Sequence, residues 1–308
     1  MRPRGRYAPS PTGSTHLGNA ATALLAWLSV RSRGGDLVLR IEDLDRPRVV
    51  PGAAERMMAD LRWLGLDWDE GPDRGGPHAP YAQSERAVRY DAAFEVLRRG
   101  RALYPCFCSR KDVLASASAP QAPGDEVFYP GTCRGLSEAE AAERIRAGHP
   151  HSWRLRVRAA SLEPFDDLIR GRIEPDPEAI GDFVVRRADG VAAYQLAVVV
   201  DDIAMGITEV VRGGDLVTST FRQIALYRVL GASPPRFGHG PLLLGEDGTR
   251  LSKRHRGVTL DELRSAGWSA ARVTGWLACR LGLRRSEEPI DPRSLVAGFD
   301  FRDILLIP

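Results

Sequence analysis

Apolar and polar positions near the N-terminus form three regular segments. Residues 5–9 and 36–42 are short, mostly apolar runs that are typical of β-strands. Between them, Gly18–Arg33 is a longer apolar segment that predicts a helix, and Gly34-Gly35 ends it. A strand, a helix and a second strand in this order make a βαβ unit. The N-terminal region therefore predicts a parallel sheet with a helix packed against it.

The rest of the chain continues to alternate between helical and extended patterns. Amphipathic spacing predicts helices over 50–64, 84–99 (with Ser84 as a possible cap), 137–147 and 215–230, and further helices up to about residue 283. Strands are predicted over 152–158, over the nearly all-apolar run Tyr194–Val200, in the residues from there to 212, and over Gly240–Leu244. The pattern is that of an α/β protein without internal repeats.

The length of 308 residues suits about two domains. Residues 103–190 differ in composition from the rest of the chain, because they hold a cluster of cysteines and an Ala/Ser/Pro/Gly-rich stretch at 115–124. We expect a catalytic domain built from 1–102 and 191–256 and split by an inserted subdomain at 103–190. A short helical region at 257–308 is expected to follow.

Composition excludes several classes of protein. Hydrophobic residues make up 43% and charged residues 27% of the chain, which is ordinary for a folded globular protein and excludes disorder as the dominant state. No apolar run reaches the ~18–20 residues of a membrane span. Met1–Arg4 leads directly into Tyr7-Ala8-Pro9 without an apolar signal region, so a cytoplasmic location is expected. The net charge of +3 permits nucleic-acid binding without requiring it.

The cysteines point to a metal. Four are too few for a disulfide scaffold, and three of them, Cys106, Cys108 and Cys133, lie close together in the sequence. Three thiolates suit a tetrahedral zinc ion, and the segment holds no nucleophile or base that suggests a catalytic metal. The candidates for a fourth ligand are Tyr129, His149, His151 and Asp125. Three unrelated reduced thiols are the alternative, and Cys279 is expected in the core of a helix.

Pro9–Asn19, between the first predicted strand and helix, has the character of an anion-binding turn. Such a turn brings free backbone N–H groups and the positive end of the helix dipole to one place, which favours phosphate. Gly13 and Gly18 permit a tight turn and close approach by a flat ligand, and His16 adds a donor. A structural turn capped by the histidine is the alternative.

Lysine is almost absent from the chain. Lys111 and Lys253 are the only lysines among 43 basic residues. A lysine that persists against such a bias is a candidate for a role that needs a compact ammonium charge. Lys253 belongs to the run Arg250-Leu251-Ser252-Lys253-Arg254, whose three cations suit a polyphosphate, whereas a surface position is enough to explain Lys111. A solvated charge run is the alternative for 250–254.

Together these segments resemble the class I aminoacyl-tRNA synthetases. Arg6–Asn19 is similar to the first signature of that class, with His16-Leu17-Gly18-Asn19 in the place of His-Ile-Gly-His. Residues 250–254 are similar to the second signature, Lys-Met-Ser-Lys-Ser, with Arg250 in the place of the first lysine. Segments 40–45, 194–202 and 210–216 resemble the glutamyl branch. The resemblance implies a catalytic core with a Rossmann-type parallel sheet.

The insert and the tail narrow the resemblance further. Residues 255–308 are too few for the helical domain with which glutamyl-tRNA synthetases read the anticodon, so none is expected. A short core with a Cys-x-Cys…Tyr-x-x-x-Cys insert resembles the glutamyl-queuosine tRNA(Asp) synthetase family. This resemblance implies a ligase that activates L-glutamate with ATP and Mg²⁺ in the absence of tRNA. It then transfers glutamate to the queuosine base in the anticodon of tRNA(Asp). A monomer is expected.

The resemblance also implies which residues form the site. Two arginines and one carboxylate suit glutamate, because an arginine fork can pair bidentately with a carboxylate. The glutamate site would comprise Arg6, Tyr7, Ala8, Pro9, Ser10, Glu42, Tyr194 and Arg212. ATP would contact Pro9, His16, Gly18, Asn19, Ser252 and Lys253, with His16 and Lys253 catalytic. One structural zinc ion would be held by Cys106, Cys108, Tyr129 and Cys133.

Three other functions fit parts of the sequence. A truncated glutamyl-tRNA synthetase would charge a tRNA 3′ end. A zinc module that only binds RNA would not need two signatures of an ATP site. A nucleotidyltransferase of the same fold would not need the combination of Arg6, Glu42, Tyr194 and Arg212.

Overall fold

The core of the molecule is a mostly parallel β-sheet. The computed structural model describes residues 2–115, 129–158, 162–243 and 258–306. Within these residues the largest sheet has six strands in the order β2-β1-β8-β9-β5-β6. All neighbours are parallel except β5 and β6, which form an antiparallel hairpin. The strands are β1 (Arg4–Tyr7), β2 (Asp36–Leu39), β5 (Phe165–Asp167), β6 (Gly171–Ile173), β8 (Glu209–Gly213) and β9 (Arg236–Gly240).

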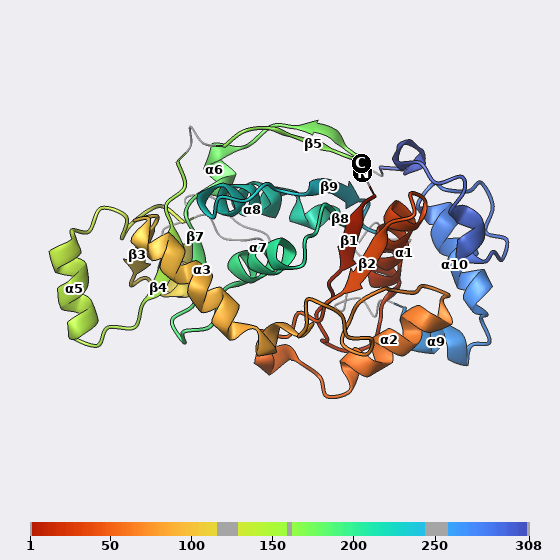
Figure 1. The fold of residues 1–308 in the computed structure, drawn as a ribbon, viewed down its shortest axis with the longest axis horizontal. Coiled ribbons are helices and arrows are strands. Elements are labelled where there is room, and N and C mark those ends of the chain that lie inside the picture. The colour runs from red at the N-terminus through yellow and green to blue at the C-terminus, as the bar shows by residue number, and fades with distance from the viewer. Residues whose placement is uncertain (1, 116–128, 159–161, 244–257, 307–308) are drawn as a thin grey trace.

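Apolar side chains cover both faces of this sheet. Leu37 and Leu39 of β2 face one hydrophobic cluster, together with α1 (Leu17–Arg31), while Val38 between them faces a second cluster. The first cluster also includes α2 (Ala53–Trp63), α9 (Leu260–Ser265) and α10 (Ala270–Arg280); the second includes α3 (Ala87–Arg99), α7 (Tyr194–Ala204) and α8 (Val217–Val229). Figure 1 shows α1 beside β1 and β2, and α9 and α10 beyond it. The predicted α/β architecture with a mostly parallel sheet is confirmed.

A smaller antiparallel sheet lies at the far end of the molecule, on the left in Figure 1. Its strands are β3 (Leu103–Cys106), β4 (Ser152–Leu155) and β7 (Phe183–Arg186), in that order. The short helices α4 (Arg110–Ala115), α5 (Glu138–Arg146) and α6 (Pro177–Ile180) belong to the same stretch of chain. A capping box between Ser137 and Glu140 starts α5. The segment 103–190 also supplies β5 and β6, which extend the large sheet.

Most predicted elements are present, and three local predictions are wrong. Tyr194–Val200 is the first part of helix α7 and not a strand. The prediction failed because residues 195–202 of this helix are all buried, so the sequence lacks the polar stripe that is typical of a surface helix. The last parallel strand is Arg236–Gly240, four residues before the predicted Gly240–Leu244. Ser84 does not cap α3; its backbone N–H and hydroxyl donate to Asp43 at 2.8 and 2.6 Å.

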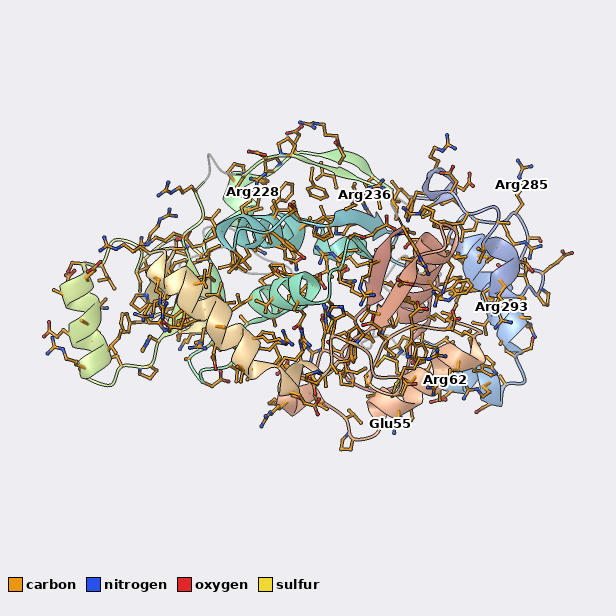
Figure 2. All side chains as sticks on the ribbon, in the orientation of Figure 1. Glu55, Arg62, Arg228, Arg236, Arg285 and Arg293 are labelled. Carbon is orange, nitrogen blue, oxygen red and sulfur yellow. The ribbon has the colours of Figure 1, made fainter. Side chains whose placement is uncertain are left out.

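Short 3₁₀ turns and charged surfaces complete the fold. The 3₁₀ turns are Arg46–Arg48, Gln83–Glu85, Gly214–Leu216, Pro292–Leu295 and Phe301–Asp303. Charged side chains such as Glu55 and Arg62 of α2 and Arg228 of α8 are exposed on the outer faces of their helices (Figure 2). In the described part of the chain, no helix combines the length and apolarity that a membrane crossing requires.

Candidate active site and metal centre

The sequence-predicted site residues meet in one cavity. It has a volume of about 650 Å³ and lies where β1 and β8 end, at the edge of the sheet where ligands of open α/β folds bind. Every predicted glutamate and ATP residue that the structure describes lines it: Arg6, Tyr7, Ala8, Pro9, Ser10, His16, Gly18, Asn19, Glu42, Tyr194 and Arg212. Segments that are far apart in the sequence thus form one concave surface. The individual roles of these residues stay predictions.

The first turn of α1 forms one wall of the cavity. His16 is the N-cap residue of this helix, and no acidic residue lies in its first turn. Gly13 has a φ of 138°, which a residue with a side chain rarely adopts, so this turn requires glycine. The cavity therefore has a positive helix end on one side, with His16, Gly18 and Asn19 among its lining residues.

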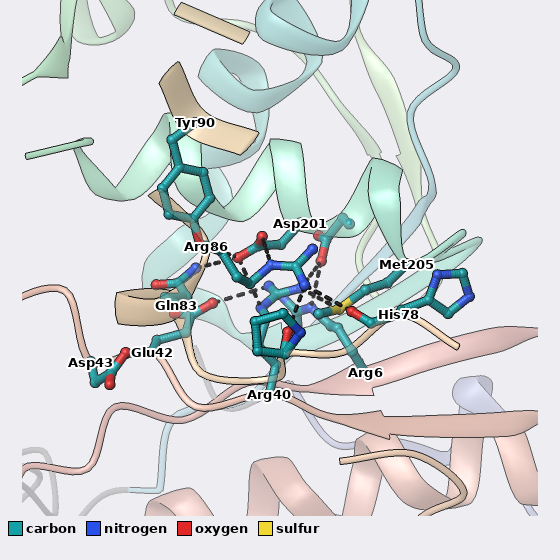
Figure 3. Close-up of polar contacts among 12 residues, drawn as sticks. Arg6, Arg40, Glu42, Asp43, His78, Gln83, Arg86, Tyr90, Asp201 and Met205 are labelled. Carbon is teal, nitrogen blue, oxygen red and sulfur yellow. Dashed lines mark hydrogen bonds and ion pairs between the residues drawn. The ribbon is translucent and has the colours of Figure 1, made fainter. Parts of the chain in front are cut away.

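Behind the cavity lies a network of buried charges, drawn in Figure 3. Arg40, fully buried, donates from Nη1 to Asp202 Oδ1 at 2.6 Å and from Nη2 to Glu42 Oε1 at 3.1 Å. Asp201 accepts from Arg86 Nε at 2.6 Å, and Gln83 and Tyr90 donate to its other oxygen at 2.9 Å. This network was not predicted from the sequence. The charged run after β2 and the Asp201-Asp202 pair were visible in the sequence, but their pairing depends on tertiary structure.

Glu42 and Tyr194 reach the cavity from segments that are distant in the sequence. The Glu42 N–H donates to the Pro9 carbonyl at 3.0 Å, which fixes the strand end beside the 9–19 turn. Burial raises the pKa of Glu42, although the Arg40 and Arg6 charges oppose this shift. Tyr194 begins α7 and is 38% exposed through the cavity that it lines; burial in the surrounding protein and the Glu42 charge raise its pKa.

The two buried arginines of the cavity, Arg6 and Arg212, are only weakly neutralised by the protein. Arg6 Nε lies 3.8 Å from Asp202 Oδ1, and within the described residues this Nε has no hydrogen-bond partner. Arg212 has no carboxylate within 4.0 Å in the same part of the chain. Its partners are the neutral groups of His239, Gln223, Thr220 and the Leu216 carbonyl. Burial lowers the pKa of Arg212.

Three cysteines form the candidate metal centre. The sulfur atoms of Cys106, Cys108 and Cys133 lie within 4.8 Å of one another, and Cys108 and Cys133 are 3.7 Å apart. Tyr129 Oη lies 3.4 Å from Cys106 Sγ and accepts from the Cys133 N–H at 2.7 Å. The predicted cysteine and tyrosine positions therefore come together in one cluster.

The two histidines that were rival fourth ligands do not join this cluster. His149 and His151 are not among the ligand atoms grouped with the three sulfurs in the described residues. The His151 ring instead packs between Phe107 and Trp153, with centroid separations of 5.6 and 5.7 Å. Asp125 lies outside the described residues.

The second predicted signature also lies outside the described residues. This applies to the whole run Arg250-Leu251-Ser252-Lys253-Arg254, so the predicted ATP contacts of Ser252 and Lys253 stay predictions from the sequence. Val258, just after it, accepts a hydrogen bond from the Leu17 N–H at 3.2 Å, and His16 forms a β-bridge with Thr259. The chain that leaves the 250–254 run therefore reaches the first turn of α1. Lys111, the other lysine, is exposed on α4.

Comparisons with known proteins agree with these features. The family model of tRNA synthetases class I (E and Q), catalytic domain, matches residues 3–289. A glutamyl-Q tRNA(Asp) synthetase of Symbiobacterium thermophilum is 55% identical over 301 residues, which are 97% of this chain and 93% of the relative. A glutamate–tRNA ligase of Anaeromyxobacter sp. is 45% identical over 98% of this chain, but the match covers 63% of that ligase.

A solved structure shares the fold over almost the whole chain. The glutamate–tRNA synthetase of Elizabethkingia anophelis superposes with a TM-score of 0.86 at 31% identity and covers 99% of this chain, which matches 67% of that protein. The resemblance found in the sequence is thereby confirmed. The chain belongs to the class I tRNA synthetases (E and Q), its relatives of similar length are named glutamyl-Q tRNA(Asp) synthetases, and it is a ligase.

Proposed function

We propose that the protein activates L-glutamate with ATP in the absence of tRNA, forming glutamyl-adenylate and pyrophosphate, and then transfers glutamate to queuosine in the anticodon of tRNA(Asp). The observation that carries the first step is the charge pattern of the cavity. Two buried guanidinium groups, Arg6 and Arg212, and one buried carboxylate, Glu42, line it. Glutamate brings two carboxylates and one ammonium, so its charges complement these three groups.

The protein supplies no close carboxylate partner to either buried guanidinium group among the described residues, so a ligand can provide one. A buried guanidinium is costly without an anionic partner. Arg212 has neutral acceptors, and Arg6 reaches Asp202 only at 3.8 Å. A bound glutamate would supply a carboxylate to each arginine, while its ammonium would meet Glu42. The Tyr194 hydroxyl is protonated at neutral pH, and its raised pKa extends this state to higher pH, so it is available as a donor to a carboxylate.

In the activation step a glutamate carboxylate oxygen attacks the α-phosphorus of ATP. The new bond is between carboxylate oxygen and phosphorus, and the bond that breaks releases pyrophosphate. Negative charge builds on the phosphoryl oxygens, where His16, Lys253 and the N-terminus of α1 would stabilise it. Mg²⁺ would be held largely by the nucleotide phosphates and water, and would neutralise part of the phosphate charge. Asp215 contributes a carboxylate to the cavity wall. Transfer to tRNA then needs mainly positioning of an already activated group.

We also propose a structural zinc ion at the cysteine cluster. In a tetrahedral site with Zn–S of about 2.3 Å and Zn–O of about 2.0 Å, two sulfurs lie about 3.8 Å apart and a sulfur and an oxygen about 3.5 Å apart. Cys108 and Cys133 are 3.7 Å apart, and Tyr129 Oη is 3.4 Å from Cys106 Sγ. These separations fit a zinc ion with Tyr129 as the fourth ligand. The ion would tie β3 to the residues that precede α5.

A second candidate function is the charging of a tRNA 3′ end. The similarity to glutamate–tRNA ligases over nearly the whole chain favours it. The chain spans about two thirds of these proteins, whereas it spans 93% of the Symbiobacterium thermophilum relative. This difference favours transfer to queuosine.

The exchange of labelled pyrophosphate into ATP tests the activation step. We expect exchange that requires L-glutamate, proceeds in the absence of tRNA and is not supported by glutamine, since glutamine lacks the second carboxylate. Strict dependence on added tRNA would favour the second candidate. No exchange with glutamate under either condition would contradict glutamate activation.

A further inference from the structure

Two buried residues behind Arg212 carry an inference that rests on the proposed function and deepens it. Parallel pairing of β8 with β9 sets Arg212 opposite His239, and β5 runs on the other side of β9. Asp167, the last residue of β5, reaches the far side of the His239 ring. We propose that Asp167 and His239 are positioning residues that hold the Arg212 guanidinium in the orientation in which it binds a glutamate carboxylate.

The contacts form a continuous chain. Asp167 Oδ2 lies 2.5 Å from His239 Nδ1, and Arg212 Nε donates to His239 Nε2 at 3.0 Å. All three residues are at most 5% exposed. Only Arg212 of the three lines the cavity. Asp167 and His239 therefore act on a ligand through Arg212.

The hydrogen bonds assign the proton on the histidine ring. Asp167 Oδ1 already accepts from the backbone N–H groups of Ile169, Arg170 and His239, at 2.9, 2.9 and 3.1 Å. Burial opposes ionisation of Asp167, but its hydrogen bonds lower its pKa on balance, so the group is a carboxylate and accepts from Nδ1–H. Burial lowers the pKa of His239 to about 4, against the opposing effect of Asp167. The ring is thus neutral near pH 7, and its Nε2 is an acceptor aimed at Arg212.

A neutral acceptor has a specific advantage at this position. Arg212 Nη1 donates to Gln223 Oε1 and Nη2 to Thr220 Oγ1, both at 2.8 Å. Because Nε donates to His239, each nitrogen of the Arg212 guanidinium is hydrogen-bonded to an uncharged group. The orientation is fixed while the positive charge is left for a ligand. A carboxylate in direct contact would fix the same orientation but neutralise that charge. Preorganisation of this kind lowers the cost of binding.

Asp167→Asn tests the assignment with almost no change of shape. Because three N–H groups hold Oδ1, the amide oxygen of the introduced asparagine takes that place and its NH₂ group faces His239 Nδ1. The ring must then accept at Nδ1 and carry its proton on Nε2, which lies 3.0 Å from both Arg212 Nε and Thr220 Oγ1, so Arg212 Nε loses its acceptor. We expect a roughly ten- to hundredfold loss of L-glutamate affinity by titration calorimetry, the loss typical of one hydrogen bond to a charged group. In glutamate-dependent exchange, the KM for glutamate should rise far more than kcat falls.

Asp166→Asn is the matched control, because it makes the same chemical change one residue away at a side chain that is 82% exposed. It should leave glutamate affinity unchanged. ¹⁵N spectra of the histidine rings give a readout that does not depend on glutamate. In the parent, His239 should carry its proton on Nδ1, and in Asp167→Asn on Nε2. A ring that keeps its proton on Nδ1 in the variant would overturn the proposed proton assignment.

A second pair of variants serves if Asp167→Asn does not fold. His239→Gln can place an acceptor near the position of Nε2, whereas His239→Asn reaches only the position of Nδ1. We expect His239→Gln to bind glutamate more tightly than His239→Asn. Equal glutamate affinity in this pair, or parent-like affinity in Asp167→Asn, overturns the positioning role. Failure of the parent itself to bind glutamate contradicts the proposed function instead, while the ring spectra still decide whether the Asp167–His239 contact has the assigned form.

Discussion

Replacement of Arg40 by methionine tests whether the buried charges behind the cavity stabilise the fold and the site. The Arg40 guanidinium lies 2.6 Å from Asp202, 3.1 Å from Glu42 and 3.7 Å from Asp201, and the side chain is fully buried. Burial disfavours the charge of Arg40, but these carboxylates raise its pKa well above the ordinary value. Methionine is unbranched and adaptable, so the substitution removes charge with little change of shape.

The size of the effect follows from the contacts that remain. Asp201 keeps its contact with Arg86, whereas Asp202 keeps, among the described residues, only the 3.8 Å approach of Arg6. Removal of one partner from a buried ion pair costs about 3–5 kcal/mol. At about 2.1 cal/mol/K per residue, the unfolding entropy of a chain of this length is about 0.65 kcal/mol/K. Dividing the loss of stability by this entropy gives a fall in Tm of about 5–8 °C.

Scanning calorimetry at pH 7 measures this fall directly. Arg89→Met, on the exposed face of α3, is the control and should leave the Tm within about 1 °C of the parent. Arg40→Met should also bind L-glutamate more weakly, because Glu42 loses a hydrogen-bonding partner. A Tm of Arg40→Met equal to that of the parent at pH 7 would show that the contacts of Arg40 do not stabilise the fold.

The same variant has a predicted pH dependence. Burial already raises the pKa of Glu42, and the Arg40 charge opposes that shift. Without Arg40 the pKa of Glu42 should rise further. A carboxyl whose folded pKa exceeds its unfolded pKa destabilises the fold as pH rises through the folded value. The deficit of Arg40→Met relative to the parent should therefore be smaller at about pH 5 than at pH 7.

Two further predictions concern the metal and the lysine. Purified protein should contain about one zinc ion per chain, and the variants Cys106→Ser and Cys133→Ser should lose both the ion and local stability. Absence of zinc from protein that was prepared without zinc depletion would contradict the assignment. Tyr129→Phe should also weaken zinc binding, and full zinc retention would exclude Tyr129 as a ligand. Lys253→Ala should slow adenylate formation by roughly 10²–10³-fold, and Lys253→Arg by part of that, because a guanidinium presents its donors differently from a compact ammonium. Lys111→Arg is the control, and a Lys253→Arg variant as fast as the parent would show that the 250–254 run is only a basic patch.

The sequence was sufficient for the features that depend on local pattern. The βαβ unit, the helix α1 and the cysteine cluster follow from periodicity and short spacings. The described cavity residues follow from the first family signature and from the three segments that resemble the glutamyl branch. Tyr194–Val200 was predicted wrongly, because every residue of this run after Tyr194 is buried, and such a run has no period that distinguishes helix from strand.

Contacts between distant segments could not be predicted from the pattern of apolar and polar residues. The pairing of Arg212 with His239 depends on the register between two parallel strands, and the strand that carries His239 was predicted four residues too late. Arg40 was visible as a charged residue in the sequence, yet its burial among carboxylates from α7 depends on how that helix packs against the end of β2. Such contacts are set by tertiary packing, which a single sequence does not display.

Transfer of labelled L-glutamate to defined tRNA shows whether queuosine is the acceptor. The protein and ATP would be incubated with tRNA(Asp) that carries queuosine, with the same tRNA lacking queuosine, and with queuosine-containing tRNA(Asp) from which the 3′-terminal adenosine has been removed. We expect labelling of both queuosine-containing tRNAs, with or without the terminal adenosine, and no labelling of the tRNA that lacks queuosine. Labelling that requires the terminal adenosine and ignores queuosine would contradict transfer to queuosine.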